Sequence, residues 1–128
     1  MARPVNKDLT DRELEVMHAF WRRGEMTASD ARDELAAAGH DLAYVTVANL
    51  ARILVDKGFL EATNDQRPFR YRAVRSFDEA ARSIVGDLLE RVFQGSREQL
   101  LVNVLGRRKK LSAKERALLE QILKEQAT

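Results

Sequence analysis

The residues best suited to chemistry in this sequence are hydrogen-bond donors and positive charges, gathered between positions 44 and 72. One set has helical spacing and the other alternates with aromatic residues: Tyr44, Thr46, Asn49 and Arg52, and then Arg67, Arg70 and Arg72. Asparagine can bind adenine through two hydrogen bonds, and arginine can bind guanine or phosphate. Residues 43–75 hold more basic than acidic side chains, whereas residues 1–42 hold more acidic ones. This pattern favours a surface that binds double-stranded DNA.

Catalytic and metal chemistry has few candidate residues. The sequence has no cysteine, which excludes disulfides, thiol nucleophiles and cysteine-based zinc or copper sites. With only two histidines, a histidine-based centre is not expected either. No phosphate-binding loop or motif around a nucleophile occurs. We therefore expect neither an enzyme nor a bound cofactor or metal.

The composition is that of a small globular protein. The 128 residues suffice for one domain, or for one small domain with an appendage, and 45% are hydrophobic while 33% are charged. No run of about 18 apolar residues occurs, so no membrane insertion is expected. The N-terminus lacks the apolar core of a signal peptide. A cytoplasmic protein is therefore expected.

Three short helices are predicted in the first half of the chain. Thr10 with Glu13 has the form of a capping box, and Gly24 ends the first helix. The second helix is predicted over residues 27–38, and Gly58 ends the third. The third helix carries the candidate DNA-binding set Tyr44 to Arg52 on its outer face. Its predicted buried stripe is Ala43, Val47, Leu50 and Leu54.

A β-hairpin is predicted after the third helix. Residues 59–63 and 69–73 have strand composition, and the turn-forming residues 64–68 separate them. The alternation in the second strand turns its aromatic residues to the core and Arg70 and Arg72 outward. Three helices followed by such a hairpin predict a winged helix-turn-helix over residues 1–74. The third helix would enter the major groove, and the wing arginines would contact phosphates or the minor groove.

Residues 75–128 are predicted to be helical to the end, which makes the fold class mainly α with a small β-hairpin. Their apolar faces are wide, but the segments are too short to form a core of their own. We expect these faces to meet a second copy of the chain, as in a homodimer. The basic run Arg107 to Lys110 is interpreted as a solvated loop. The residues expected to form the dimer contact are Ile84, Leu88, Val92, Leu101, Leu105, Leu118, Leu119 and Ile122.

Several segments resemble the penicillinase-repressor (BlaI/MecI/CopY) family, and together they cover nearly the whole chain. They are Leu9-Thr10-x-x-Glu13-x-Glu15-Val16-Met17 with Trp21, Gly24 and Thr27, then Tyr44-x-Thr46-Val47-x-x-Leu50, Lys57-Gly58-Phe59-Leu60, Phe69-Arg70-Tyr71 and Leu111-Ser112-x-x-Glu115. The resemblance implies a homodimeric repressor on a dyad-symmetric DNA operator. Thr46 and Asn49 fall where the family carries DNA-contacting threonines, whereas Val45, Ala48 and Ile53 replace charged residues of the family.

The same resemblance implies a mechanism by which repression of transcription is relieved. Members of the family are commonly cleaved in the C-terminal region under the control of a membrane-bound metalloprotease sensor, either by the sensor or by a protease that it activates. The family's Asn-Phe cleavage position corresponds to Asn103-Val104 here, where the phenylalanine is replaced. The copper-responsive branch uses a C-terminal cysteine cluster, which this chain lacks.

Two other interpretations stay open at the level of sequence. A winged helix can serve protein–protein interaction alone, and the near-neutral net charge of +2 is compatible with that. A repressor of another winged-helix family could bind a small molecule at its dimer interface, although no segment identifies such a pocket. Salt dependence distinguishes DNA binding from the first alternative, because DNA binding through several phosphates weakens steeply as the salt concentration rises.

Overall fold

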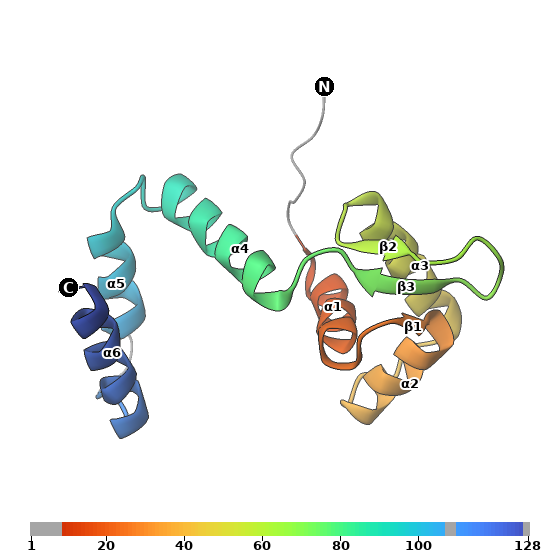
Figure 1. Ribbon diagram of the computed structural model, residues 1–128, viewed down its shortest axis with the longest axis horizontal. Helices are drawn as coiled ribbons and strands as arrows, with labels where there is room; N and C mark the ends of the chain where they lie inside the picture. Colours follow the sequence, from red (N-terminus) through yellow and green to blue (C-terminus); the bar gives the residue numbers. More distant parts are fainter. Residues whose placement is uncertain (1–8, 107–109, 127–128) are drawn as a thin grey trace. The chain divides into compact units, whose positions relative to one another are not determined.

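The computed structural model describes residues 9–106 and 110–126, and most of the basic run, Arg107 to Lys109, lies outside these ranges. The chain divides into two compact units, residues 1–82 and 83–128. The first unit contains three helices, a small sheet and the first turn of a fourth helix (Figure 1). The second unit is helical.

Helix α1 (Asp11–Arg23) begins and ends at the predicted residues. The backbone N–H of Thr10 donates to Oε1 of Glu13 over 3.0 Å, and the N–H of Glu13 donates to Oγ1 of Thr10 over 3.1 Å. These two bonds satisfy donors that the first helical turn leaves without partners. Gly24 follows at φ 89°, a conformation that strains residues with a Cβ atom. The predicted capping box and glycine stop are confirmed.

Helices α2 (Ala28–Ala37) and α3 (Tyr44–Asp56) complete the three-helix core. Thr27 caps α2 through a reciprocal pair of bonds with Asp30. The buried stripe predicted for α3 is partly wrong: Ala43 is exposed at the N-cap, and Ala51 is fully buried instead. Alanine is small enough to suit either environment, so the helical pattern alone did not separate the two. The fully buried residues of α3 are Val47, Ala51 and Leu54.

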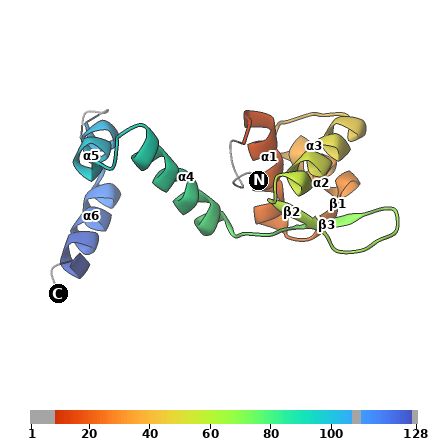
Figure 2. The ribbon, with the colours of Figure 1, turned by 90° about the horizontal axis from the view of Figure 1, so that it is seen from above.

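The hairpin is confirmed as β2 (Leu60–Ala62) and β3 (Arg70–Ala73), but the sheet has a further strand. Strand β1 (Met26–Thr27) pairs antiparallel with β3, and the strand order is β1-β3-β2. In Figure 2, α1 and α3 lie to one side of β2 and β3. The core between helices and sheet is built mainly from Val16, Met17, Phe20, Met26, Ala31, Leu35, Val47, Leu54, Phe59 and Leu60.

Helix α4 (Phe77–Arg91) starts against the winged helix. The indole Nε1 of Trp21 donates to the backbone oxygen of Arg75 over 3.0 Å. The rings of Trp21 and Phe77 meet edge to face with centroids 5.4 Å apart, and Ala80 is 2% exposed. The start of α4 is therefore packed on α1, as part of the first unit.

The second unit contains the rest of α4, together with α5 (Arg97–Leu105) and α6 (Ala113–Gln126). Ser96 and Ser112 cap the two last helices through their Oγ atoms. Helices α5 and α6 lie side by side (Figures 1 and 2) and line a common groove. Neither helix buries a single described residue.

Candidate nucleic-acid interface

The first turns of α3 present polar side chains to solvent. Tyr44, Thr46, Asn49 and Arg52 are all exposed, as the sequence predicted, and Tyr44 is 46% exposed. Ala43 provides no side-chain cap, so the first N–H groups of α3 are not satisfied by a capping side chain. Ala48, on the same helix, is half-buried and packs on the core.

Asn49 and Arg52 form a pair on this face. Nη2 of Arg52 donates to Oδ1 of Asn49 over 3.1 Å, one helical turn apart. The bond orients the amide of Asn49, and its Nδ2 group stays available as a donor. Asparagine binds adenine through both the oxygen and the nitrogen of its side-chain amide. Arg52 would therefore have to release Oδ1 before Asn49 could make both hydrogen bonds to a base.

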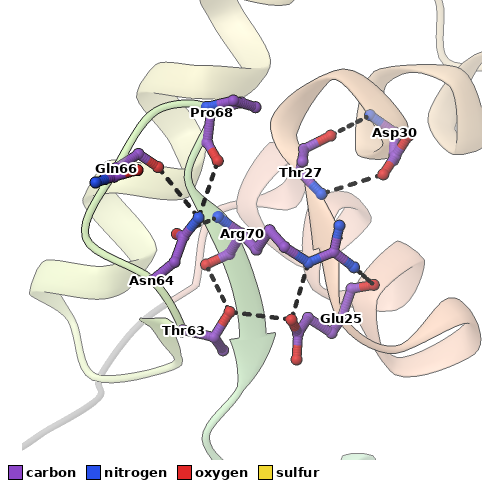
Figure 3. Close-up of polar contacts among 8 residues, drawn as sticks. All are labelled: Glu25, Thr27, Asp30, Thr63, Asn64, Gln66, Pro68 and Arg70. Atoms are coloured by element: carbon purple, nitrogen blue, oxygen red, sulfur yellow. Dashed lines mark hydrogen bonds and ion pairs between the residues drawn. The ribbon is translucent and has the colours of Figure 1, made fainter.

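The wing consists of β2, β3 and the loop of residues 63–69, which projects beyond the helices (Figures 1 and 2). Asn64 organises this loop, as Figure 3 shows. Its Nδ2 donates to the backbone oxygens of Gln66 and Pro68 over 3.1 and 3.2 Å, and its Oδ1 accepts from the N–H of Arg70 over 2.9 Å. One side chain thus fixes three points of the loop.

A groove of about 420 Å³ lies between the wing, the start of α2 and the start of α3. It is lined by Thr27, Ala28, Ser29, Tyr44, Ala48, Arg67, Pro68, Phe69 and Tyr71. Burial raises the pKa of Tyr71, the nearby Tyr44 adds to this rise, and Arg52 and Arg67 oppose it. The groove therefore brings Tyr44 of the predicted α3 set and the wing arginine Arg67 to one surface, and Arg52 acts electrostatically on the same Tyr71.

The three predicted wing arginines have different surroundings. Nε of Arg70 lies 2.9 Å from Oε2 of Glu25, and Nε of Arg72 lies 2.7 Å from Oε2 of Glu61. The hydrogen bond from Arg70 lowers the pKa of Glu25, with a further contribution from Thr63, and Glu61 raises the pKa of Arg72. Arg67 is exposed and makes no hydrogen bond or ion pair with any described residue.

Three residues that shape this surface were not anticipated from sequence. Glu61 faces Arg72 in the β2–β3 register, so the hairpin pattern contains the signal for that pair. Glu25 lies 45 positions from Arg70 and is brought to it by β1, a strand too short to leave an alternating pattern. Asn64 stands in a loop-forming stretch, where its type alone does not reveal three bonds.

The predicted dimer residues lie on the helices of the second unit and at the end of α4. All but Leu119 are exposed, including Leu118 at 58% and Val92 at 63%. A mainly apolar groove of about 730 Å³ lies between α5 and α6 and includes residues of the segment between them. It is lined by Val104, Leu105, Lys110, Leu111, Glu115, Leu118, Leu119 and Ile122. The wide apolar face predicted for this region therefore lacks a partner within the described residues of the chain.

The predicted cleavage position lies inside α5. Nδ2 of Asn103 donates to the backbone oxygen of Gln99 over 2.8 Å, within the helix, and Val104 is 59% exposed. The peptide bond between Asn103 and Val104 is consequently at the surface and in helical conformation.

The His, Asp and Glu side chains of the described residues form no group of three or more that could hold a metal ion. Within residues 9–106 and 110–126, no helix combines the length and the apolarity needed to cross a membrane.

Comparison with known proteins gives a family and weaker structural likenesses. No curated protein matches the chain. A structure of BpsR from Bordetella bronchiseptica, solved to explain regulation of its DNA binding by 6-hydroxynicotinic acid, is 19% identical with a TM-score of 0.47, over 92% of this chain and 75% of that one. A cysteine-to-serine mutant of MarR from E. coli is 22% identical with a TM-score of 0.46, over 94% and 79% of the two chains. The model of the penicillinase repressor family matches residues 9–125. The chain belongs to the penicillinase repressor family.

Proposed function

We propose that this chain represses transcription as a homodimer that places α3 of each protomer in a major groove of a dyad-symmetric DNA operator. The observation that carries the proposal is the single surface formed by the exposed face of α3 and the wing, which share the groove lined by Tyr44 and Arg67. Thr46 and Asn49 would contact bases, and Arg52 a phosphate or guanine. Arg70 and Arg72 would bind phosphate only by leaving their carboxylates or by sharing the guanidinium with them.

The proposed second subunit is another copy of the chain. Helices α5 and α6 bury none of their described residues, yet they carry exposed leucines and isoleucine along one groove. Removal of apolar surface of this extent from water would stabilise the association of two copies. A two-fold dimer would cover the same patch on both of them. A dimer also matches a dyad-symmetric operator, because its half-sites lie about one helical turn or a multiple apart.

We propose that repression is relieved by cleavage in the C-terminal region, at the bond between Asn103 and Val104. The protease would be a membrane metalloprotease sensor or a protease that it activates. A protease needs its substrate in an extended conformation, so α5 must unwind before cleavage. Helix α5 has nine residues and buries none of them, and the cost of local unwinding is therefore small. Cleavage there would separate every residue that lines the groove, from Val104 to Ile122, from the rest of the chain and so weaken the dimer.

The base-reading role of α3 is tested with the variant Asn49→Ala on an operator selected from random duplexes. A two-bond contact to a base contributes about 1–3 kcal/mol, so we expect affinity to fall by about fivefold or more for each protomer. Arg12→Ala is the matched control. Its neighbour Glu13 contacts Lys57, at the opposite end of α3 from Tyr44, so Arg12 lies far from the proposed interface. Unchanged affinity of Asn49→Ala would remove this residue from the interface.

A further inference from the structure

The ion pair between Glu25 and Arg70 is held more firmly than a single surface contact. Oε2 of Glu25 accepts from Nε of Arg70 over 2.9 Å and from Oγ1 of Thr63 over 3.1 Å. Nη2 of Arg70 also lies 3.4 Å from the backbone oxygen of Glu25. Figure 3 shows the carboxylate between the two side chains of the wing. Arg70 is therefore bound to both the side chain and the backbone of one residue.

This arrangement opposes the binding of phosphate by Arg70. A phosphate that approached Arg70 would have to displace the carboxylate or share the guanidinium with it, in the presence of a second negative charge. Glu25 lies two residues before Thr27, which lines the groove between the wing and α3. Its charge also acts on Arg72, whose pKa it raises after the larger contribution of Glu61, so it affects two of the three wing arginines.

Arg67 is the contrasting case. It lines the groove, is exposed, and has no hydrogen bond or ion pair with the residues that the structure describes. Its positive charge is available to phosphate without the loss of an existing contact. A phosphate contact made by Arg67 would thus release counterions from DNA without breaking an ion pair within the described part of the protein.

We propose that Glu25 is a positioning residue that lowers the affinity of the winged helix for DNA phosphate by retaining Arg70 on the protein, so that Arg67 is the phosphate-binding arginine of the wing. The inference rests on the proposed DNA-binding function. Weak binding to phosphate favours specificity, because it lowers the affinity for arbitrary sequence and leaves discrimination to α3.

The test measures binding of the full chain to a labelled duplex of arbitrary sequence by fluorescence anisotropy, over a series of potassium chloride concentrations. Each phosphate contact adds about 0.9 to the slope of log affinity against log salt. We expect Glu25→Gln to bind several-fold more tightly and to steepen the slope by about 0.9 for each protomer bound. Glu34→Gln is the matched control, because Glu34 is also paired with arginines, Arg22 and Arg23, on a surface outside the groove. The control is expected to keep the wild-type slope.

Two further variants separate the roles of the arginines. E25Q/R70Q removes the pair as a unit and keeps the wild-type net charge, so we expect wild-type affinity and slope. Arg67→Gln is expected to lower the slope by about 0.9 for each protomer. The inference is overturned if Glu25→Gln leaves the slope unchanged, or if E25Q/R70Q loses as much slope as Arg67→Gln. Failure of the wild-type chain to bind at low salt would instead overturn the proposed function, and this inference with it.

Discussion

The contact between Glu13 and Lys57 gives the most exact stability prediction. Glu13 is 5% exposed, its carboxylate accepts the N–H of Thr10 over 3.0 Å, and Nζ of Lys57 lies 2.7 Å from Oε1. The pair joins the start of α1 to the residue that follows α3. It therefore helps to hold the helix that carries the proposed DNA-binding face.

The cost of Glu13→Gln can be estimated from these contacts. Glutamine keeps an oxygen for Thr10 but loses the charge that faces Lys57. Hydrogen bonds to charged groups contribute about 1.5–3 kcal/mol, and the loss of a partner from a fully buried ion pair costs about 3–5 kcal/mol. Because the side chain of Lys57 is 31% exposed, water can replace part of the interaction. We expect the free energy of unfolding to fall by about 1–2 kcal/mol at pH 7.

The pH dependence provides a second readout of the same contact. Burial alone would raise the pKa of Glu13, but the hydrogen bonds from Lys57 and Thr10 outweigh it and lower the pKa below 4.5. A carboxylate with a lowered pKa stabilises the folded state above its unfolded pKa, and this stabilisation is lost as the pH falls through the folded pKa. The difference in the free energy of unfolding between wild type and Glu13→Gln should therefore be largest at neutral pH and shrink under acid conditions.

Urea unfolding at one fixed protein concentration measures both effects, because dimerisation makes apparent stability depend on concentration. Trp21, the single tryptophan, lies in the winged helix and reports on its unfolding through fluorescence. Glu15→Gln is the control, since Glu15 is on the same helix and pairs with the exposed Arg12, and its effect should stay within about 0.5 kcal/mol. Equal stability of Glu13→Gln and wild type at pH 7 would refute the reasoning.

Three more predictions concern the core, the dimer and the wing. Leu54→Ala, at a fully buried position, should lower the free energy of urea unfolding by about 2–5 kcal/mol. Ile53→Ala, at the partly exposed neighbouring position, should lower it by less than about 1 kcal/mol. Ile122→Glu places a charge in the groove between α5 and α6 and should yield monomers in sedimentation experiments, whereas Lys124→Glu should stay dimeric; a dimeric Ile122→Glu protein would contradict the proposed interface. Asn64→Ala removes three bonds from the wing loop, and we expect weaker DNA binding with a nearly unchanged unfolding free energy, because the loop is exposed; unaltered DNA affinity would show that wing order does not matter.

The parts of the fold that the sequence predicted are those with short-range causes. Thr10 with Glu13 and Gly24 determine the ends of α1 through contacts within a few residues, and their chemistry is visible in the sequence. The alternation in β3 likewise placed Arg70 and Arg72 outward and Tyr71 inward, because strand geometry requires it. The prediction for Phe69 was wrong, because this residue precedes β3 and lines the wing groove. The family match supports the same overall assignment.

The parts that could not be predicted depend on tertiary contacts. The partner of Arg70 is Glu25, which approaches only because β1 pairs with β3, and a strand of two residues has no recognisable pattern. Ala43 is exposed although burial was predicted, and the burial of Ala51 was not predicted, because alanine has little preference for burial. Charge patterning therefore placed the arginines correctly but could not tell which of them is already bound to a carboxylate.

The central claim, that the chain is a dimeric DNA-binding repressor, is tested most directly by a footprint of the purified full chain on the DNA upstream of its own gene. The experiment uses excess competitor DNA and a series of salt concentrations. The account predicts a protected dyad-symmetric site whose protection fades as salt rises. Absence of protection at low salt, from a chain shown to be folded and dimeric, would contradict it and favour a winged helix that binds only protein.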